Sequence, residues 1–303
     1  MKVLIIGLGS IGRKHIAALR RYVSDVEIYA LRSDIKSFPY EDVTDFYQWD
    51  EVLKLSYDFV IISNPTSMHR STIEKLQALN IPLFIEKPLF DSLKGGHLVE
   101  KLCKKQIPTY VACNLRFLEV LRSLHKRIEN SIVNEVNVYC GSYLPDWRPG
   151  IDYRTCYSVI PEMGGGVHID LIHELDYIYW FFGKPNKVHR VFTHKSSLGI
   201  HAYDYANYLL EYRNFNVNVT LNYYRRDSKR TCEIVTSENT FTADLLHGTI
   251  TDGQGQVIDE YSQRISDTYY DQMYDFLKML RSGDFDFNTV EDAYNVLKIC
   301  LES

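Results

Sequence analysis

The sequence lacks the features that mark membrane, secreted and nucleic-acid-binding proteins. No apolar stretch is long enough to span a bilayer, and residue 3 already begins an apolar run, so we expect neither a membrane span nor a signal peptide. The net charge is −5 and no long basic run appears, so nucleic acid is not an expected partner. The six cysteines are scattered without a CxxC pair; disulfides and a zinc cluster are not expected, and the cytoplasm is the natural compartment.

Low-complexity tracts, internal repeats and a flexible linker are absent as well, yet the sequence changes character near residue 118. Its 303 residues suffice for two domains of ordinary size. Residues 1–118 alternate apolar strands with helical patterns, which predicts an α/β domain with a doubly wound parallel sheet, the Rossmann arrangement. The expected strands are 2–6, 26–31, 58–63, 82–85 and 109–113, and the expected helices lie around 11–22, 67–79 and 92–106.

Residues 119–303 predict an α+β domain instead. The segment 215–223, FNVNVTLNY, alternates apolar and polar residues, as does a strand of an antiparallel sheet with one buried face. Apolar stripes at helical spacing follow near the end of the chain, over 270–277 and 290–297. Alternation similar to that of 215–223 occurs at 135–140, 188–193 and 205–210.

A glycine fingerprint lies at the end of the first expected strand. Residues 3–12 read VLIIGLGSIG, with Gly7, Gly9 and Gly12 in GxGxxG spacing. At a strand-to-helix turn, the first glycine allows the tight turn, the second lets the backbone approach a pyrophosphate, and the third lets the helix pack on the strand. Because the helix N-terminus also offers unpaired N–H groups to an anion, the segment predicts a dinucleotide site rather than an ordinary glycine-rich turn.

The end of the second expected strand bears on which dinucleotide binds. An acidic residue about 20 positions after the last glycine usually accepts the ribose 2′-OH and selects NAD(H). Arg32 stands at this place and is followed by Ser33, and a guanidinium can bind a 2′-phosphate in a bidentate fork. We therefore favour NADP(H). In the alternative, Arg32 is a solvated strand-end residue, Asp34 takes the ribose, and NAD(H) binds.

Two further strand regions end in polar residues, in ISNPTSMH (62–69) and in LFIEKPLF (83–90). In an open parallel sheet, ligands bind outside the carboxyl ends of the strands, so both segments are expected around the nicotinamide. Lys87 is a candidate to move the proton of a substrate hydroxyl; the alternative is a surface ion pair with Glu86. The residues assigned to the cofactor are Gly7, Gly9, Ser10, Ile11, Gly12, Arg32, Ser33, Asn64, Pro65, His69, Glu86 and Lys87.

The glycine run at 164–166 opens a predicted helix that ends at Gly183. At about 100° per residue, Asp170, His173 and Asp176 share one stripe of this helix, opposite an apolar stripe. Such a stripe is either a solvated face or part of an active site. The preceding glycines imply close approach of backbone, which favours a site where His173 moves a proton. One histidine with carboxylates falls short of a zinc site, so no metal is expected.

The segment between the two halves is expected to contact the substrate. Aromatic rings stack on sugar faces, and arginines bind carboxylates or phosphates. Packing between domains explains each residue equally well when it is taken alone. Together the residues suggest an anionic substrate such as a sugar acid or a nucleotide sugar. The residues assigned to the substrate are Asn114, Arg116, Trp147, Tyr153 and Asp176.

Three segments together resemble one enzyme family. GLGSIG at the N-terminus, EKP at 86–88 and GGG…D…HELD at 164–176 are similar to the Gfo/Idh/MocA oxidoreductases. The resemblance implies a Rossmann domain, a C-terminal α/β domain with a large open sheet, and hydride transfer to or from a carbon of a sugar or cyclitol. It also implies a catalytic role for Lys87, a Pro88 that is often cis, and substrate contacts from Asp170 and His173.

The sequence departs from the family pattern in two places. Most relatives place three residues between the acidic residue and the histidine, whereas two separate Asp170 from His173, which makes Asp176 a rival partner. NPTSMH at 64–69 stands where many relatives have a Thr-Pro-Asn order, so the nicotinamide contacts are expected to differ there.

The predicted function is that of an NAD(P)-dependent oxidoreductase acting on a CH–OH group of a sugar, sugar acid or nucleotide sugar. Lys87, His173 and Asp170 are the expected catalytic residues. One alternative keeps the cofactor but uses transient oxidation for elimination or glycoside cleavage, and another is a non-catalytic dinucleotide-binding sensor. Relatives commonly associate through the open sheet, and the polar face of residues 216–222 suits such an interface, so we expect a homodimer or homotetramer.

Overall fold

The structure, a computed structural model, describes residues 1–36 and 38–302, which form two compact units. The first unit comprises Met1–Cys113 and Tyr269–Leu297, and the second comprises Asn114–Thr268 and the chain end from Lys298. The expected division at residue 118 lies close to the first change of unit. It did not include the return of residues 269–297 to the first unit.

Aromatic packing accounts for that return. Phe276, in helix α8 (Thr268–Ser282), is fully buried. Its ring meets Phe59 and Phe84 edge-on, with centroids 4.9 and 5.1 Å apart, and both of those rings belong to strands of the first sheet. The apolar stripe that predicted this helix therefore faces the core of the first unit.

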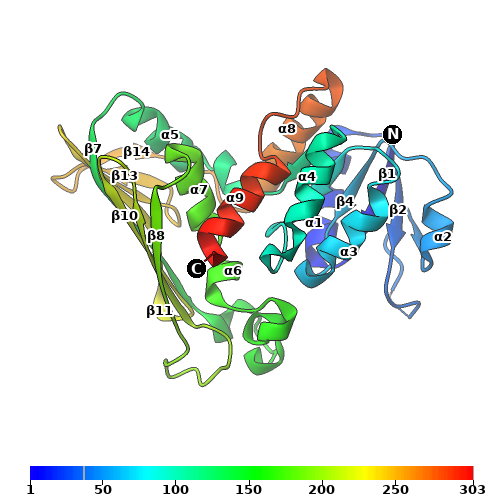
Figure 1. Ribbon diagram of the computed structural model, residues 1–303, viewed down its shortest axis with the longest axis horizontal. Helices are drawn as coiled ribbons and strands as arrows, with labels where there is room; N and C mark the ends of the chain where they lie inside the picture. Colours follow the sequence, from blue (N-terminus) through cyan, green and yellow to red (C-terminus); the bar gives the residue numbers. More distant parts are fainter. Residues whose placement is uncertain (37, 303) are drawn as a thin grey trace. The chain divides into compact units, whose positions relative to one another are not determined.

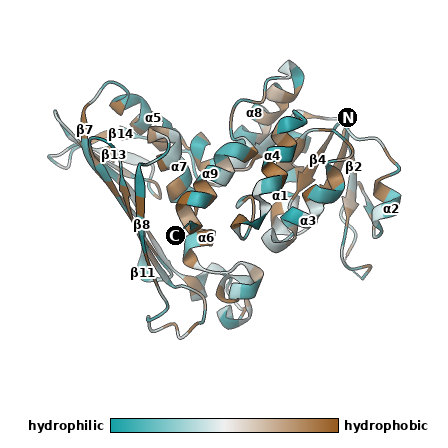
Figure 2. Cartoon of the chain, viewed as in Figure 1, coloured by the Kyte–Doolittle hydropathy of each residue, from teal (hydrophilic) through white to brown (hydrophobic). Residues whose placement is uncertain are grey.

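A six-stranded parallel sheet forms the centre of the first unit, in the order β3-β2-β1-β4-β5-β6. Its central strands are buried on both faces, as in other parallel sheets covered by helices, and are brown in Figure 2. The predicted strands are confirmed to within two residues, whereas β3 was not expected because its sequence, VTDF, contains no apolar run. The strands are β1 (Lys2–Ile6), β2 (Glu27–Leu31), β3 (Val43–Phe46), β4 (Phe59–Ile62), β5 (Leu83–Ile85) and β6 (Thr109–Val111).

Helices pack along this sheet, as Figure 1 shows for α1, α3 and α4. α1 presents Ile16, Ala18 and Leu19 to the core, which gives it the apolar stripe seen in the sequence. The helices are α1 (Ser10–Tyr22), α2 (Trp49–Val52), α3 (Thr66–Leu76) and α4 (Gly96–Lys104), with α9 (Val290–Leu301) near the end of the chain.

An eight-stranded sheet forms the second unit, in the order β14-β13-β12-β11-β7-β10-β9-β8. It is antiparallel except where β10 pairs with β7 in parallel. Val217, Val219 and Leu221 are fully buried, so the alternation in β10 predicted its buried face. The strands are β7 (Val133–Tyr143), β8 (Lys187–Thr193), β9 (Tyr205–Glu211), β10 (Asn216–Asn222), β11 (Tyr224–Thr236), β12 (Thr240–Asp244), β13 (Thr249–Thr251) and β14 (Val257–Glu260).

Three helices, α5 (Glu119–Ile128), α6 (Val167–Asp170) and α7 (His173–Phe182), lie on one side of this sheet in Figure 1. The other side carries half-exposed polar residues such as Asn137, Asn218 and Thr220. The second unit is therefore a layer of helices on an open sheet, and the predicted fold class is confirmed. Among the residues that the structure describes, no helix has the length and apolarity that a membrane crossing requires.

Candidate active site

The glycine loop has the backbone that a dinucleotide site requires. Gly7 has φ of 89°, a conformation that favours glycine, and its N–H donates to Leu31 O at 3.1 Å. A Cβ on Gly7 would lie 2.6 Å from Asn64 Cα, and one on Gly12 would lie 2.8 Å from Gly7 O. A Cβ on Gly9 would meet nothing within 4 Å. The first and third glycines thus permit close packing, while the second leaves space for a ligand beside the backbone.

The start of α1 fits the pyrophosphate of a dinucleotide. Gly9 is its N-cap and no side chain caps the helix. Ser10 is exposed at the first turn, and Ile11 beside it is half-buried. The first N–H groups of this 13-residue helix therefore point into the space beside Gly9, where the helix dipole favours an anion.

Arg32 does not have the predicted environment. It is 7% exposed, and its Nη1 donates to Asp45 Oδ2 at 2.9 Å and to Phe38 O at 3.0 Å. The guanidinium thus fixes the end of β2 to β3, and the Asp45 carboxylate neutralises its charge. Ser33 and Asp34 follow it and are exposed. The predicted phosphate-binding role of Arg32 finds no support in this environment, because the guanidinium is buried and its charge is paired with Asp45.

The segment after β4 contacts the glycine loop. Ser63 Oγ donates to Gly7 O at 2.8 Å, and Asn64 Nδ2 donates to Thr72 Oγ1 at 2.8 Å. Pro65 is exposed and directly precedes α3. Asn64 therefore lies where the glycine turn and α3 meet, at the carboxyl end of the sheet.

His69 is placed differently from the prediction, which assigned it to the cofactor. The residue is 1% exposed, and its ring nitrogens lie 3.0–3.2 Å from the carbonyl oxygens of Asn64, Pro88 and Leu89. Whichever nitrogen carries the proton donates to a backbone carbonyl. Burial lowers the pKa of His69. The ring joins the segment after β4 to the one after β5 and offers little surface to a ligand.

Lys87 lies in the loop after β5. Its peptide bond to Pro88 is cis, as the family resemblance implied, and its side chain is half-buried. Glu86 N donates to Ile62 O, so the backbone continues the β4–β5 ladder, and Glu86 Oε2 accepts from Lys87 N at 3.1 Å. The other carboxylate oxygen lies 2.5 Å from Nε2 of His15, a fully buried residue of α1. The glycine loop, Asn64 and Lys87 therefore gather at one edge of the parallel sheet.

In the second unit, the predicted long helix is two helices. α6 ends at Asp170 and α7 begins at His173, because Leu171 leaves helical geometry with φ of −100° and ψ of 30°. The single stripe expected from about 100° per residue does not continue across this break. Asp170 and Asp176 are 7% and 1% exposed, whereas His173 is half-buried, so the three residues do not form one face.

Asp170 lies among aromatic side chains. Its Oδ2 accepts a 2.6 Å hydrogen bond from the hydroxyl of Tyr223, which is fully buried. Burial, and next the Asp170 carboxylate, raise the pKa of Tyr223, so this hydroxyl stays a donor at any physiological pH. The pKa of Tyr157 is raised for the same reasons, burial first and Asp170 second. The Tyr223 hydroxyl thus orients the Asp170 carboxylate.

Three residues assigned to the substrate are buried and paired instead. Arg116 donates from Nε and Nη2 to the two oxygens of Asp176, at 3.0 and 2.8 Å, and their side chains are 4% and 1% exposed. Asn114 Nδ2 donates to Thr268 Oγ1 at 2.7 Å, inside the same unit. The Arg116–Asp176 pair ties the start of the second unit to α7, and Asn114 contacts the first residue of α8. None of the three has the exposed position that a substrate contact would require. Both carboxylate oxygens of Asp176, the predicted rival partner of His173, accept from Arg116.

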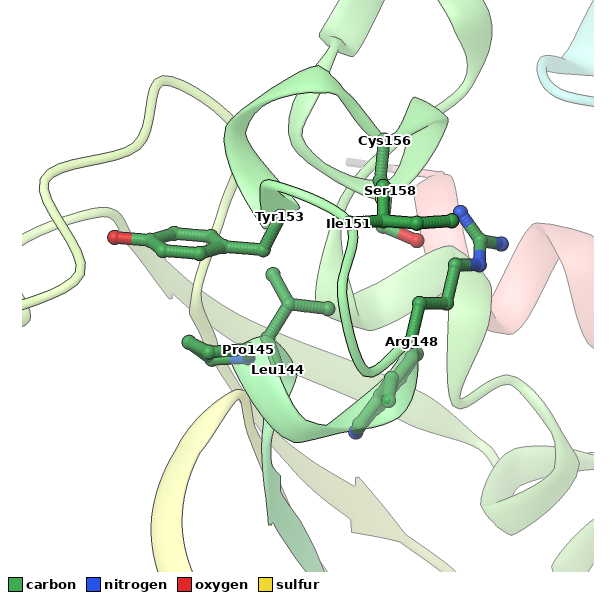
Figure 3. Close-up of a pocket in the computed structure, with 8 residues that line it drawn as sticks. Leu144, Pro145, Arg148, Ile151, Tyr153, Cys156 and Ser158 are labelled. Carbon is green, nitrogen blue, oxygen red and sulfur yellow. The ribbon is translucent and has the colours of Figure 1, made fainter.

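Trp147 and Tyr153 line a cavity of the second unit (Figure 3). Its volume, about 10 Å³, has room for one water and not for a sugar ring. Trp147 Nε1 donates to Ser142 Oγ, and its ring meets Tyr223 edge-on at 5.3 Å, while Tyr153 donates its hydroxyl to Leu198 O. Arg148 reaches across the cavity toward Cys156 and Ser158 in Figure 3. The hydrogen bonds and the ring contact hold Trp147 and Tyr153 in place beside the cavity. Trp147 nevertheless remains 36% exposed.

Comparison with known proteins agrees with both units. Residues 1–112 match the model described as "Oxidoreductase family, NAD-binding Rossmann fold", and residues 126–300 match "Oxidoreductase family, C-terminal alpha/beta domain". The chain belongs to the Gfo/Idh/MocA oxidoreductase family. The family resemblance read from the glycine fingerprint, the EKP segment and the glycine run is thereby confirmed.

The relatives matched in sequence include a cyclitol dehydrogenase. The inositol 2-dehydrogenase/D-chiro-inositol 3-dehydrogenase of Lacticaseibacillus casei is 27% identical over 195 residues, which cover 59% of this chain and 52% of that protein. The chain thus spans about half the length of the relatives that it matches in sequence.

Two solved structures share the fold over nearly the whole chain. UDP-N-acetylglucosamine 3-dehydrogenase GnnA from Acidithiobacillus ferrooxidans has a TM-score of 0.80 at 18% identity, covering 100% of this chain and 96% of that one. The WlbA dehydrogenase from Bordetella pertussis, in complex with NADH and UDP-GlcNAcA, has a TM-score of 0.80 at 15% identity, covering 98% and 93%. At these identities the likeness shows the fold.

Three residues that the sequence did not single out interact with predicted site residues: His15 with Glu86, and Tyr157 and Tyr223 with Asp170. His15 falls on the buried side of a predicted helix, and a histidine on an apolar stripe was the available signal. Tyr223 had been placed on the buried face of a strand, where its ring alone explained it. A buried hydroxyl needs a partner, but Asp170 lies 53 positions away in the sequence, and no local pattern links the two residues.

Proposed function

We propose that this protein is an NAD(P)-dependent oxidoreductase that acts on a CH–OH group of a sugar-type substrate. The observation that carries the proposal is the convergence of the glycine loop, Asn64 and Lys87 at one sheet edge. A bound nicotinamide would accept or return the hydride. The chain itself must then place the cofactor, exclude water and take the proton of the hydroxyl.

Lys87 and His173 are the proposed proton-handling residues. Oxidation of an alcohol carbon releases a hydride to the cofactor and a proton from the oxygen, so a base is required in that direction and an acid in reverse. In the first unit, Lys87 follows the buried strand β5; in the second, His173 begins α7 with its ring half-buried. Asp170 is proposed to orient the substrate hydroxyl or His173, since Tyr223 fixes its carboxylate.

The choice between NADP(H) and NAD(H) is proposed to lie with Ser33 and Asp34. The sequence favoured NADP(H) because of Arg32, but the structure pairs that guanidinium with Asp45. Ser33 and Asp34 are exposed at the end of β2, where the adenosine ribose of a dinucleotide is bound in this fold. A hydroxyl at Ser33 accommodates a 2′-phosphate, whereas the Asp34 carboxylate suits a ribose 2′-OH.

An anionic sugar is the proposed substrate class. Trp147 and Tyr157 are 36% and 40% exposed, and the Arg148 guanidinium lies 5.1 Å from the centre of the Tyr157 ring. Exposed rings suit the apolar face of a sugar, and a guanidinium suits a carboxylate or phosphate. The nucleotide sugars named for two solved structures of the same fold are anionic and agree with this class, whereas the inositol named for a relative in sequence is uncharged.

A substrate panel tests the proposal. Purified protein with NAD+ or NADP+ is mixed separately with inositols, aldonic and uronic acids, and nucleotide sugars, and the reduced nicotinamide and the sugar products are measured. We expect net reduction of the cofactor with an acidic sugar, at least about tenfold above the neutral sugar of the same ring. Product formation with the cofactor unchanged would instead show transient oxidation. Absence of any sugar-dependent change would support a sensor.

A homo-oligomer through the open face of the second sheet is proposed as well. Asn207 donates to Asn218 Oδ1 at 2.9 Å and to Thr220 Oγ1 at 3.1 Å across neighbouring strands, so the polar face is pre-ordered. Light scattering tests this proposal, and a monomer at micromolar concentration would exclude it.

A further inference from the structure

A buried histidine of α1 holds the loop that carries Lys87. His15 is fully buried, and its Nε2 lies 2.5 Å from Glu86 Oε1. Because a carboxylate only accepts hydrogen bonds, Nε2 carries the proton of this contact. The other oxygen, Oε2, accepts from the backbone N–H of Lys87. Glu86 therefore connects α1 directly to the residue proposed to move the substrate proton.

Glu86 is held through its backbone N–H and both oxygens of its carboxylate. Its N–H donates to Ile62 O in the sheet, and the two carboxylate oxygens are used by His15 and Lys87. Beyond it, the carbonyls of Pro88 and Leu89 meet the buried ring of His69. Lys87 thus lies in a short loop whose backbone is held on both sides, while its own side chain is half-buried.

We propose that His15 is a positioning residue for Lys87, acting through the carboxylate of Glu86. Loss of His15 removes the donor to Oε1, so the carboxylate can rotate and release the Lys87 N–H. α1 also begins at the glycine loop. The start of this helix would therefore bind the pyrophosphate, while His15 in its second turn would position Lys87. The inference rests on the proposed function, since positioning matters only if Lys87 handles a proton.

Packing alone is the competing explanation for His15. Its ring meets Phe84 edge-on at 4.8 Å and Tyr269 at 5.8 Å, so an aromatic side chain would keep these contacts. A packing role predicts that His15→Phe is harmless and that His15→Gln, which fills the space less well, is worse. A positioning role predicts the reverse order, because glutamine keeps an N–H donor and phenylalanine has none.

Steady-state kinetics separate the two roles. We expect His15→Phe to lower kcat by about 10- to 100-fold with the KM for the dinucleotide within about threefold, because a misplaced group costs turnover rather than binding. His15→Gln should recover kcat to within about fivefold of the wild type. His125→Phe is the control, since His125 is a histidine of the second unit stacked on Phe181 at 4.6 Å. Wild-type kcat in His15→Phe, or no recovery in His15→Gln, would overturn the proposal.

Amide hydrogen exchange of residues 83–90 gives a readout independent of activity. We expect exchange at Lys87 to be at least about tenfold faster in His15→Phe, and close to wild type in His15→Gln and His125→Phe. Unchanged exchange in His15→Phe would overturn the positioning role even if every variant were inactive. Faster exchange in a protein that oxidises no sugar would leave the hold on Lys87 intact and reject the proposed function.

If His15→Phe does not fold, Glu86→Gln tests whether the Glu86 carboxylate positions Lys87. The substitution keeps the volume but removes the charge from both hydrogen bonds of the side chain. Lower kcat and faster exchange at Lys87 are expected. Wild-type values of both would overturn the proposal.

Discussion

The hydroxyl of Tyr223 donates a 2.6 Å hydrogen bond to Asp170 from a fully buried position in the second unit. Asp170 itself is 7% exposed, and a hydrogen bond from a hydroxyl stabilises a buried carboxylate. The relationship gives Asp170 a fixed orientation before any substrate arrives. It also means that Asp170 is held by a side chain from the connection between β10 and β11, outside the α6–α7 segment.

Tyr223→Phe is expected to lower kcat/KM and stability together. Removing the donor leaves the Asp170 carboxylate short of a partner, which costs about 1–3 kcal/mol in unfolding free energy. If the transition state loses a similar free energy of binding, kcat/KM falls by about 10- to 100-fold. Urea denaturation and initial rates measure both. Tyr208→Phe is the control, because Tyr208 is also a buried tyrosine, and its hydroxyl contacts Cys300 Sγ at 3.5 Å. Wild-type kcat/KM in Tyr223→Phe would contradict the role given to this contact.

Arg32→Met is expected to reduce stability without changing the choice of cofactor. The substitution leaves Asp45, whose side chain is 13% exposed, without its cation, at a cost of about 3 kcal/mol. The ratio of KM for NADP(H) to KM for NAD(H) should change by less than about threefold. The double variant Arg32→Met/Asp45→Leu should recover stability. A tenfold or larger rise in the KM for NADP(H) alone would restore the phosphate-binding role of Arg32.

Ser33→Glu tests the residue that we propose in its place. A carboxylate here repels a 2′-phosphate, so the KM for NADP(H) should rise at least about tenfold while the KM for NAD(H) stays within about threefold. Equal effects on both cofactors would show that the end of β2 does not discriminate between them.

The ion pair of Arg116 and Asp176 is expected to act on stability alone. Asp176→Leu leaves a buried guanidinium without its partner and should cost about 3–5 kcal/mol, whereas Arg116→Met/Asp176→Leu should be closer to the wild type. The double variant should keep the KM for the sugar within about threefold. Loss of sugar binding in a well-folded double variant would reinstate the predicted substrate contacts.

His168 is expected to make the fold sensitive to acid. Burial lowers the pKa of His168 to about 4, while an unfolded chain has a histidine pKa near 6.5. The unfolded state therefore binds the proton first, so stability falls as the pH drops below about 6.5 and levels off below about 4. From about pH 7 to about pH 5, this residue accounts for a loss of about 2 kcal/mol.

Urea denaturation of His168→Phe at the two pH values measures this share. The replacement suits the site, since His168 packs beside Phe192 and Tyr203 with centroids 5.0 and 5.3 Å away. In His168→Phe, the unfolding free energy lost on acidification should be smaller by about 2 kcal/mol than in the wild type. Part of the loss should remain, because burial also lowers the pKa of His69. An unchanged loss would contradict the assignment.

Many strands of both sheets could be predicted because each is formed by a local pattern of apolar residues. Buried strands such as β4 are continuous apolar runs, and the alternation in β10 identified its buried face. The edge strand β3 and the polar strand β11 carry neither pattern, so neither was found. The return of α8 to the first unit depends on which aromatic residues Phe276 meets, and the order of residues along the chain does not show that.

The sequence predicted which residue types the candidate site contains, but it could not show which charged residues pair with each other. Arg32 and Asp45 are 13 positions apart, and Arg116 and Asp176 are 60 apart, so nothing local shows that their charges are already used. The stripe of Asp170, His173 and Asp176 assumed one continuous helix, and the break at Leu171 removed it. The glycine loop could be recognised from its own residues, since the GxGxxG spacing reflects the backbone conformation of the loop itself.

Single-turnover reduction of the bound cofactor, compared between the wild type and Lys87→Met, tests directly whether Lys87 moves the substrate proton. We expect both proteins to bind the dinucleotide with similar affinity, and the wild type to form about one reduced nicotinamide per site with a substrate sugar. Lys87→Met should form it about 10²- to 10⁴-fold more slowly, the usual contribution of a proton-transfer residue. Reduction by Lys87→Met at the wild-type rate would contradict the account.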